Sequence, residues 1–512
     1  MIIINKVKMM VKGVLPLCLF TLLPFSASAQ DFDVIRGNCL PESEVTVDGP
    51  RHAPARRLPA INTSWDANRE YRQAVVLVSF SDRDFSTEKA QERYDSIFNY
   101  PGFNKGAGLG CVADYYRDQS NGLLNLKFDV YGPIKVAKAT TEYGTYGSSA
   151  FSSATKKLID SLNVDMTPYD WNNDGYVNQV IYVYAGFGGN ESSTKGCIWP
   201  NTSSFAAVTA GSVIISNYTA SAELWARGTL CGIGTVCHEF THSLGLPDLY
   251  PVGNSSELSV VDEFDLMDGG NFINNGWCPC NLSAFEKMQL GWLTPVELTT
   301  ATSVKNLKPV ADGGDAYMIK VTDDEYLLLE NRQWTGWDVR IPGHGLMIAH
   351  VDYNASAWSG NSVNSTSTHH RYDYYHADNR DYTTWRSMVT SLGLTRTNGH
   401  SPILQYTPYP YAVDLFAGDS ITVGNDSLTA TSVPAMTVFA SDQPLNKPIT
   451  NIVMNDDGTV SFDFMSLPTE IVSSIKDIKT DDDALYDMQG RRIVGTPQRG
   501  LYIQNGRKFF LK

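Results

Sequence analysis

The pair His238 and His242 is the part of this sequence best suited to chemistry, within HEFTHSLGLPD at residues 238–248. Residues four apart lie on one face of an α-helix, so both imidazoles can offer a ring nitrogen to one metal ion. Apolar residues at helical spacing form a stripe on the other side: Ile233, Val236, Cys237, Phe240 and Leu244. The pattern predicts a helix over residues 232–244 that buries the stripe and turns its histidines toward a cleft.

Gly245 and Pro247 predict a sharp end to this helix, because a left-handed glycine commonly terminates helices and a proline blocks their continuation. The turn can bring Asp248 back as a third ligand. Three protein ligands leave a fourth tetrahedral position open, which is typical of a catalytic zinc site. Ligand type alone also permits copper or nickel.

Glu239 is next to a ligand and is the expected general base, which takes a proton from the attacking water and passes it to the leaving amine. The alternative is a chance motif on an ordinary helix. With 9 histidines in 512 residues, a chance His-Glu-x-x-His is expected in roughly one such chain in a hundred. Requiring Gly245 and Asp248 as well makes chance far rarer.

The flanking sequence predicts an α+β fold whose catalytic domain, residues 71–298, has a mixed sheet and the active-site helix. Apolar or alternating runs predict strands at residues 74–80, 124–130 and 177–184, and helices are expected at 111–120 and 152–162. From about residue 300, short apolar runs between turns predict a β-rich domain over 299–468. A linker at 469–483 and a small β tail at 484–512 follow.

The N-terminus reads as a cleaved secretory signal over residues 1–29, with three early lysines, an apolar run at 13–25 and Ala27-Ser28-Ala29 before the cut. Residues 30–70 are expected to be a pro-segment with a dibasic site at Arg56-Arg57, or alternatively an ordered N-terminal arm. We therefore expect a secreted or cell-surface protein without a transmembrane anchor. The net charge of -15 disfavours a nucleic-acid partner.

The zinc motif resembles that of the metzincin-like peptidases with aspartate as the last ligand, and is similar to the immune inhibitor A family of secreted bacterial metalloendopeptidases. Residues 112–126, 170–188, 264–277, 283–293 and 343–353 also carry this resemblance, which spans about residues 60–465. It implies cleavage of internal peptide bonds, a zymogen activated by another protease, and structural calcium. It also implies that Met267 forms the turn packed beneath the zinc.

Weaker signals leave alternatives open. Both a short calcium loop and a plain turn fit the oxygen-bearing residues Asp170, Asn172, Asp174, Tyr176 and Asn178, and the resemblance favours calcium. Seven cysteines remain after the signal. Among them, Cys278 and Cys280 suggest disulfide bracing near the site. Cys39 could be a latency thiol on the zinc, an ordinary disulfide partner or a free thiol.

The last 29 residues resemble the sorting tails of the type nine secretion system, which would imply export through an outer-membrane machinery. The function predicted from the whole sequence is a secreted zinc metalloendopeptidase acting on extracellular proteins. A binding or adhesion protein on an inactive zincin scaffold is the alternative from another class, although the three ligands and the base are intact. A narrow-specificity peptidase is the enzymatic alternative.

Overall fold

The computed structural model describes residues 58–189, 198–225, 228–252, 259–381, 384, 415–417, 425–465 and a few segments between 485 and 511. The predicted signal, the linker, Cys39 and most of the tail lie outside these residues. In the tail the structure describes a hairpin of β14 (Gly500–Gln504) and β15 (Arg507–Leu511).

The first sheet has the strand order β2-β1-β3-β5-β4. Its strands are β1 (Glu70–Ser79), β2 (Asn125–Lys135), β3 (Val180–Phe187), β4 (Asn201–Ala210) and β5 (Val213–Leu224). Neighbouring strands are parallel except for β4, which is antiparallel to β5 and forms an edge. The predicted mixed sheet is therefore confirmed.

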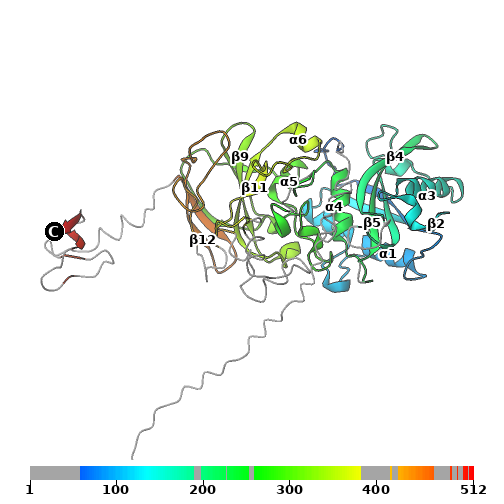
Figure 1. Cartoon of the computed structure of the whole chain (residues 1–512), viewed down its shortest axis with the longest axis horizontal. Helices are drawn as coiled ribbons and strands as arrows, with labels where there is room; N and C mark the ends of the chain where they lie inside the picture. The colour runs from blue at the N-terminus through cyan, green and yellow to red at the C-terminus, as the bar shows by residue number, and fades with distance from the viewer. Residues whose placement is uncertain are drawn as a thin grey trace, which may run out of the picture. The chain divides into compact units, whose positions relative to one another are not determined.

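Helices cover both faces of this sheet. Successive side chains of a strand point to opposite faces, so a strand buried on both sides needs a packing partner on each face. Val75 and Ile181 share a core with the apolar sides of α1 (Ala90–Asn99), α2 (Val112–Gln119) and α4 (Gly234–Ser243). On the other face Phe151, from α3 (Ser148–Asp160), packs on Tyr182 and Tyr218. Helix α4 lies beside β5 (Figure 1).

A second sheet has the order β11-β10-β9-β8-β6. Its strands are β6 (Val296–Glu297), β8 (Tyr317–Lys320), β9 (Glu325–Arg332), β10 (Gly345–Asp352) and β11 (Tyr372–Tyr374). A third sheet joins β7 (Thr302–Leu307), β12 (Ile449–Met454) and β13 (Val460–Phe464). The region after residue 299 is β-rich, as the sequence predicts.

Strand β9 explains how the second sheet joins the molecule. Leu328 belongs to the large core that contains helix α4, whereas Leu327 and Leu329 belong to a second core with the third sheet. All eight residues of β9 are buried. The apolar run at residues 326–329 is thus a strand covered on both faces.

Short helices complete the chain between the sheets. They are α5 (Ala284–Gln289), α6 (Ala355–Ser359), η2 (Lys105–Ala107), η3 (Thr140–Tyr143), η4 (Thr167–Tyr169), η5 (Asp262–Phe264), η6 (Gly270–Phe272), η7 (Val310–Asp312) and η8 (Gly336–Asp338). Within the part of the chain that the structure describes, no helix is long and apolar enough to cross a membrane.

Residues 58–69, from the end of the expected pro-segment, pack on the catalytic part and on the region after residue 299. Leu58 is buried and its backbone N–H donates to the Ser359 carbonyl at 3.0 Å. Trp65 donates its indole N–H to the Leu290 carbonyl at 2.7 Å. This stretch is therefore an ordered arm that precedes β1.

Candidate metal centre

The structure brings together the three residues expected to bind metal. One ligand atom from each of His238, His242 and Asp248 lies within 4.8 Å of the others, and all three residues are buried. Oδ1 of Asp248 lies 3.1 Å from Nε2 of His238 and 3.0 Å from Nε2 of His242. Among the described residues this is the one such group of three or more potential ligands.

Hydrogen bonds on the far side of each ring fix which nitrogen faces the centre. Nδ1 of His238 lies 2.8 Å from the Leu266 carbonyl, and Nδ1 of His242 lies 2.7 Å from the Leu246 carbonyl. A carbonyl oxygen only accepts, so Nδ1 carries the proton in both rings and Nε2 of a neutral ring carries a lone pair. Two lone pairs and a carboxylate oxygen then face one another, and this donor set fits a divalent cation.

Charge in the centre favours an ionised carboxylate. Burial by itself would raise the pKa of Asp248, but its close contacts with the imidazoles of His242 and His238 hold that pKa well below its ordinary value. The site is therefore matched to a positive charge placed between these side chains.

The turn after α4 delivers Asp248. Gly245 has φ of +105°, a conformation that residues with a Cβ rarely adopt, and its N–H donates to the His242 carbonyl at 3.0 Å. A Cβ at Gly245 would lie 2.6 Å from Cγ1 of Ile61 and 3.0 Å from the Pro59 carbonyl. The ordered arm thus packs directly on the metal-binding turn.

Glu239 is buried beside His238 on α4 and is held by a residue that the sequence did not point to. The Thr202 hydroxyl, from the edge strand β4, lies 3.0 Å from Oε2 of Glu239 and 2.5 Å from its backbone carbonyl. The Thr219 hydroxyl on β5 donates to Oε1 of Gln179 at 2.6 Å and lies 3.3 Å from that carbonyl. The candidate base is therefore attached to the sheet. No motif in the sequence around Thr202 predicts this contact.

Met267 is fully buried in the large core, and the backbone around it supports two sides of the centre. The Leu266 carbonyl accepts from His238, and the Met267 carbonyl accepts from the Leu249 N–H at 2.8 Å. The turn thereby links one histidine ligand to the residue that follows Asp248.

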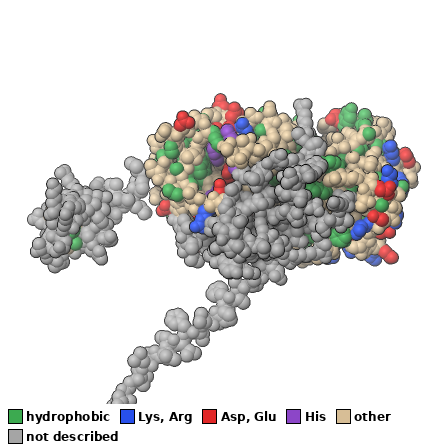
Figure 2. Space-filling view, in the orientation of Figure 1, with side chains coloured by type: hydrophobic (Ala, Val, Ile, Leu, Met, Phe, Trp, Pro, Cys, Tyr) green, Lys and Arg blue, Asp and Glu red, His purple; other side chains and the backbone are tan. Residues whose placement is uncertain are grey.

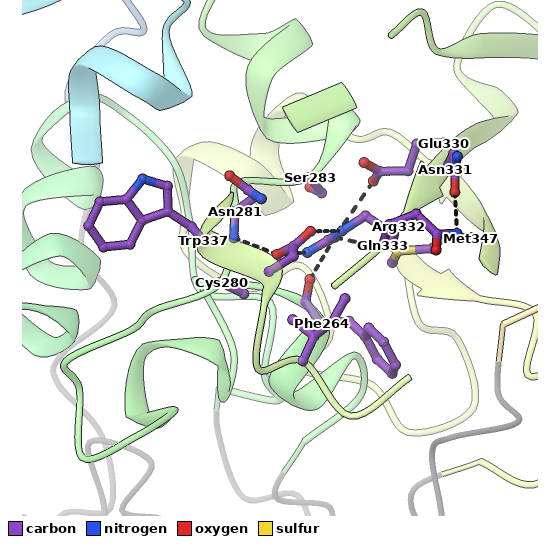
Figure 3. A network of polar contacts seen from close by, with 12 residues as sticks. Phe264, Cys280, Asn281, Ser283, Glu330, Asn331, Arg332, Gln333, Trp337 and Met347 are labelled. Carbon is purple, nitrogen blue, oxygen red and sulfur yellow. Dashed lines mark hydrogen bonds and ion pairs between the residues drawn. The ribbon is translucent and has the colours of Figure 1, made fainter. Parts of the chain in front are cut away.

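A buried polar network includes the backbone of Phe264, three residues before Met267 (Figure 3). Arg332 of β9 donates from Nη1 to the Phe264 carbonyl at 2.9 Å. Its Nε and Nη2 bind the carboxylate of Asp338 at 2.7 and 2.9 Å. Asp338 also accepts from the Asn281 N–H at 2.8 Å. A guanidinium of the second sheet therefore braces the segment that carries Met267.

The residues of the expected calcium loop lie together in one turn, and the side-chain oxygens of Asp170, Asp174 and Asn178 accept hydrogen bonds from the protein. Asp170 accepts from the N–H groups of Asp174 and Gly175, and Asp174 accepts from the Tyr176 N–H and the Asn172 amide. Asn178 Oδ1 accepts from the Trp171 N–H at 2.7 Å. These hydrogen bonds are typical of a turn formed by Asn, Asp and Gly without a bound ion. They give no support for a calcium site.

The expected disulfide bracing at Cys278 and Cys280 is not supported. Both side chains are buried free thiols that form no disulfide in the structure. The Cys278 thiol donates to the Trp337 carbonyl at 3.5 Å, and burial raises its pKa to about 12. These cysteines pack as small apolar groups in the core. The possible latency thiol, Cys39, lies outside the described residues, so that expectation remains untested.

Several histidines outside the zinc motif are visible on the surface near acidic side chains (Figure 2). His369 pairs with Asp352 at 2.7 Å and His350 pairs with Glu325 at 2.7 Å. Both imidazoles stack on Phe439. This group fastens the loop before β12 to the second sheet, and it lies apart from the metal centre.

Comparison with known proteins supports the geometry of the centre. Residues 62–293 match the model of the immune inhibitor A peptidase M6 catalytic domain. No curated protein matches the chain. The matched segment contains all three candidate ligands, Glu239 and Met267. Residues 62–293 therefore resemble the catalytic domain of the immune inhibitor A (M6) peptidases, and this resemblance supports a metallopeptidase.

Proposed function

We propose that this protein is a secreted zinc metalloendopeptidase that hydrolyses peptide bonds in extracellular proteins, with Glu239 as general base and acid. The observation that carries the proposal is the convergence of His238, His242 and Asp248, with Glu239 directly after His238 on the same helix. Two imidazoles and one carboxylate are a common catalytic zinc set. An inactive scaffold would have no need to retain the base as well.

When bound, zinc supplies Lewis-acid chemistry that polarises the scissile carbonyl and lowers the pKa of water. Glu239 accepts the proton of the attacking water and then delivers it to the leaving amine. The Thr202 hydroxyl contacts both Oε2 and the backbone carbonyl of Glu239, and these contacts restrain the orientation of the carboxylate. His238 and His242 keep their Nε2 atoms on the metal side because their Nδ1 protons are bound by carbonyls.

The edge strand β4 favours an extended peptide as substrate. An exposed strand edge can pair with an extended chain through main-chain hydrogen bonds. Strand β4 lies at the edge of the first sheet, and Thr202 of this strand contacts Glu239. A peptide added along β4 would therefore pass the candidate base. This mode of binding suits internal bonds of a polypeptide.

Export would use the signal at residues 1–29 and, for the outer membrane, the sorting-like tail at 484–512. Activation would remove residues up to Arg56-Arg57. The ordered arm from Leu58 onward packs on the catalytic part, so we place the cut before it. N-terminal sequencing of the secreted active protein tests this placement; a start within residues 59–69 would contradict it.

Metal analysis and proteolysis assays on the wild type and on Glu239→Ala test the catalytic proposal. We expect about one zinc per chain in both proteins, because Glu239 is not a ligand. Casein cleavage should fall by several orders of magnitude in the variant. Equal cleavage by both proteins would refute the assigned base.

Two further outcomes separate the alternatives. A wild type that binds zinc but cleaves neither casein nor a library of short peptides would favour the binding protein. Cleavage of only a few peptides from the library would favour the narrow-specificity peptidase.

A further inference from the structure

Asn361 contacts the third candidate ligand from a distant part of the chain. It lies two residues after the end of α6 (Ala355–Ser359), 113 positions from Asp248 and beyond the matched segment 62–293. Its side chain is almost fully buried. The metal centre therefore includes a contact from the region that follows the catalytic domain.

The amide of Asn361 makes two hydrogen bonds to one residue. Its Oδ1 accepts from the backbone N–H of Asp248 at 2.7 Å, and its Nδ2 donates to Oδ2 of the same aspartate at 2.7 Å. Oδ1 of Asp248 faces the two imidazoles. The two carboxylate oxygens thus have separate partners, since one faces the metal position and the other is held by Asn361.

Asparagine suits this place on two counts. The backbone of Asn361 has φ of +52°, a conformation that asparagine adopts more readily than most residues. An amide also offers one acceptor and one donor, which match the N–H and the carboxylate of Asp248. An aspartate at position 361 would meet the carboxylate of Asp248 with a second negative charge.

A neighbouring asparagine fixes the same turn. Asn364 donates through Nδ2 to the carbonyls of Leu249 and Tyr372, each at 2.7 Å, and accepts from the Tyr372 N–H at 3.1 Å. Tyr372 begins β11 of the second sheet. The loop with both asparagines therefore ties residues 248–249 to that sheet.

We propose that Asn361 is a positioning residue for the metal centre, which orients Asp248 so that it binds the ion through Oδ1 alone. This inference rests on the proposed zinc-dependent function. Hydrogen bonds to a ligating carboxylate fix its orientation, and loss of such outer contacts typically lowers metal affinity about 10- to 100-fold. The region after the catalytic domain thus completes the metal site.

Two substitutions in the full chain test the proposal. Asn361→Asp preserves the size and the tolerance for positive φ but replaces the donor with a carboxylate oxygen. Asn361→Gly removes both hydrogen bonds without backbone strain. Asn354→Ala is the control, because Asn354 lies at the other end of α6, is exposed, and its side chain accepts from the Ala357 N–H rather than contacting Asp248.

The first measurement is zinc affinity by chelator competition. We expect both Asn361 variants to bind zinc about 10- to 100-fold more weakly than the wild type, with Asn354→Ala within about twofold. The second is the visible absorption of the cobalt-substituted protein, which reports ligand geometry. The bands should shift in the Asn361 variants and stay unchanged in the control.

The contrary results are distinct. Zinc affinity and cobalt bands equal to wild type in both Asn361 variants would overturn the proposal. So would a drop in stability of the metal-free protein with unchanged zinc affinity per folded molecule, because that marks a purely structural role. A wild type that binds no zinc would instead refute the proposed function.

Discussion

Each of the three candidate metal ligands is held through an atom that does not face the expected metal position. The Nδ1 atoms of His238 and His242 are bound by backbone carbonyls, and Oδ2 of Asp248 is bound by Asn361. Such contacts set ring and carboxylate orientation before an ion arrives. The site is therefore preorganised by three segments of the chain, of which the zinc motif is only one.

Glu239 is also held by a contact of this kind, from the Thr202 hydroxyl. The substitution Thr202→Val tests how much this contact contributes to activity. The substitution removes the hydroxyl that binds Oε2 but preserves the branched shape. A hydrogen bond to a charged group contributes about 1.5–3 kcal/mol, so we expect kcat/KM to fall about 10- to 100-fold. Zinc content should stay at the wild-type level. Steady-state proteolysis and metal analysis measure both quantities.

Thr209→Val is the control for this prediction, because Thr209 is an exposed residue of the same strand β4. Its activity should equal that of the wild type. If Thr202→Val retained full activity, the hydroxyl would not orient the base.

The sequence predicted the local part of this centre and missed the rest for a physical reason. His238, His242 and Asp248 lie within eleven residues, so helix periodicity and one glycine turn suffice to bring them together. Thr202 and Asn361 reach the same centre across 37 and 113 positions. No spacing rule connects residues that only the tertiary fold brings together.

At the scale of elements, the end of α4 is a contact surface as well as a turn. The backbone at Gly245 leaves room for Ile61 and Pro59 of the ordered arm, and a side chain would fill that space. Glycine is thus required here twice, by its positive φ and by the close approach of another segment.

For this reason Gly245→Ala should lower the free energy of unfolding by more than Gly313→Ala does. Gly313 has φ of +76° with nothing within 4 Å of an added Cβ, so alanine there meets backbone strain alone. We expect a loss of about 1 kcal/mol in the free energy of unfolding at Gly313 and of about 3 kcal/mol at Gly245. Chemical denaturation of the metal-free proteins measures both. Equal losses would show that the arm yields without cost.

Element prediction succeeded where periodicity was strong. The apolar run at 74–80 is β1, and the expected helix at 111–120 is α2 with a capping box at Cys111 and Asp114. Strand β4 escaped notice, because NTSSFAAVTA is rich in small polar residues and several of its side chains are exposed at the sheet edge. That strand nevertheless carries Thr202, so the weakest sequence signal lay next to the candidate base.

At the scale of the whole molecule, the second sheet is built into the core of the catalytic part. Tyr326 and Leu328 of β9, Met347 of β10 and Tyr372 of β11 share one apolar core with Val236 and Phe240 of α4. A boundary near residue 299 marks a change of secondary structure along the chain, but side chains from both sides of it pack together. We therefore expect these parts to unfold together.

Arg332→Met tests this coupling, since Arg332 of β9 binds Asp338 and the Phe264 carbonyl in the buried network of Figure 3. Its loss leaves the buried carboxylate of Asp338 without its cationic partner, so the free energy of unfolding should fall by about 3–5 kcal/mol. Zinc release and tryptophan fluorescence should still follow one transition in urea.

Lys320→Ala is the control, because it removes an exposed ion pair with Glu297 and should lower the free energy of unfolding by less than about 1 kcal/mol. Equal losses, or zinc release well before the fluorescence change, would show that the second sheet is energetically separate.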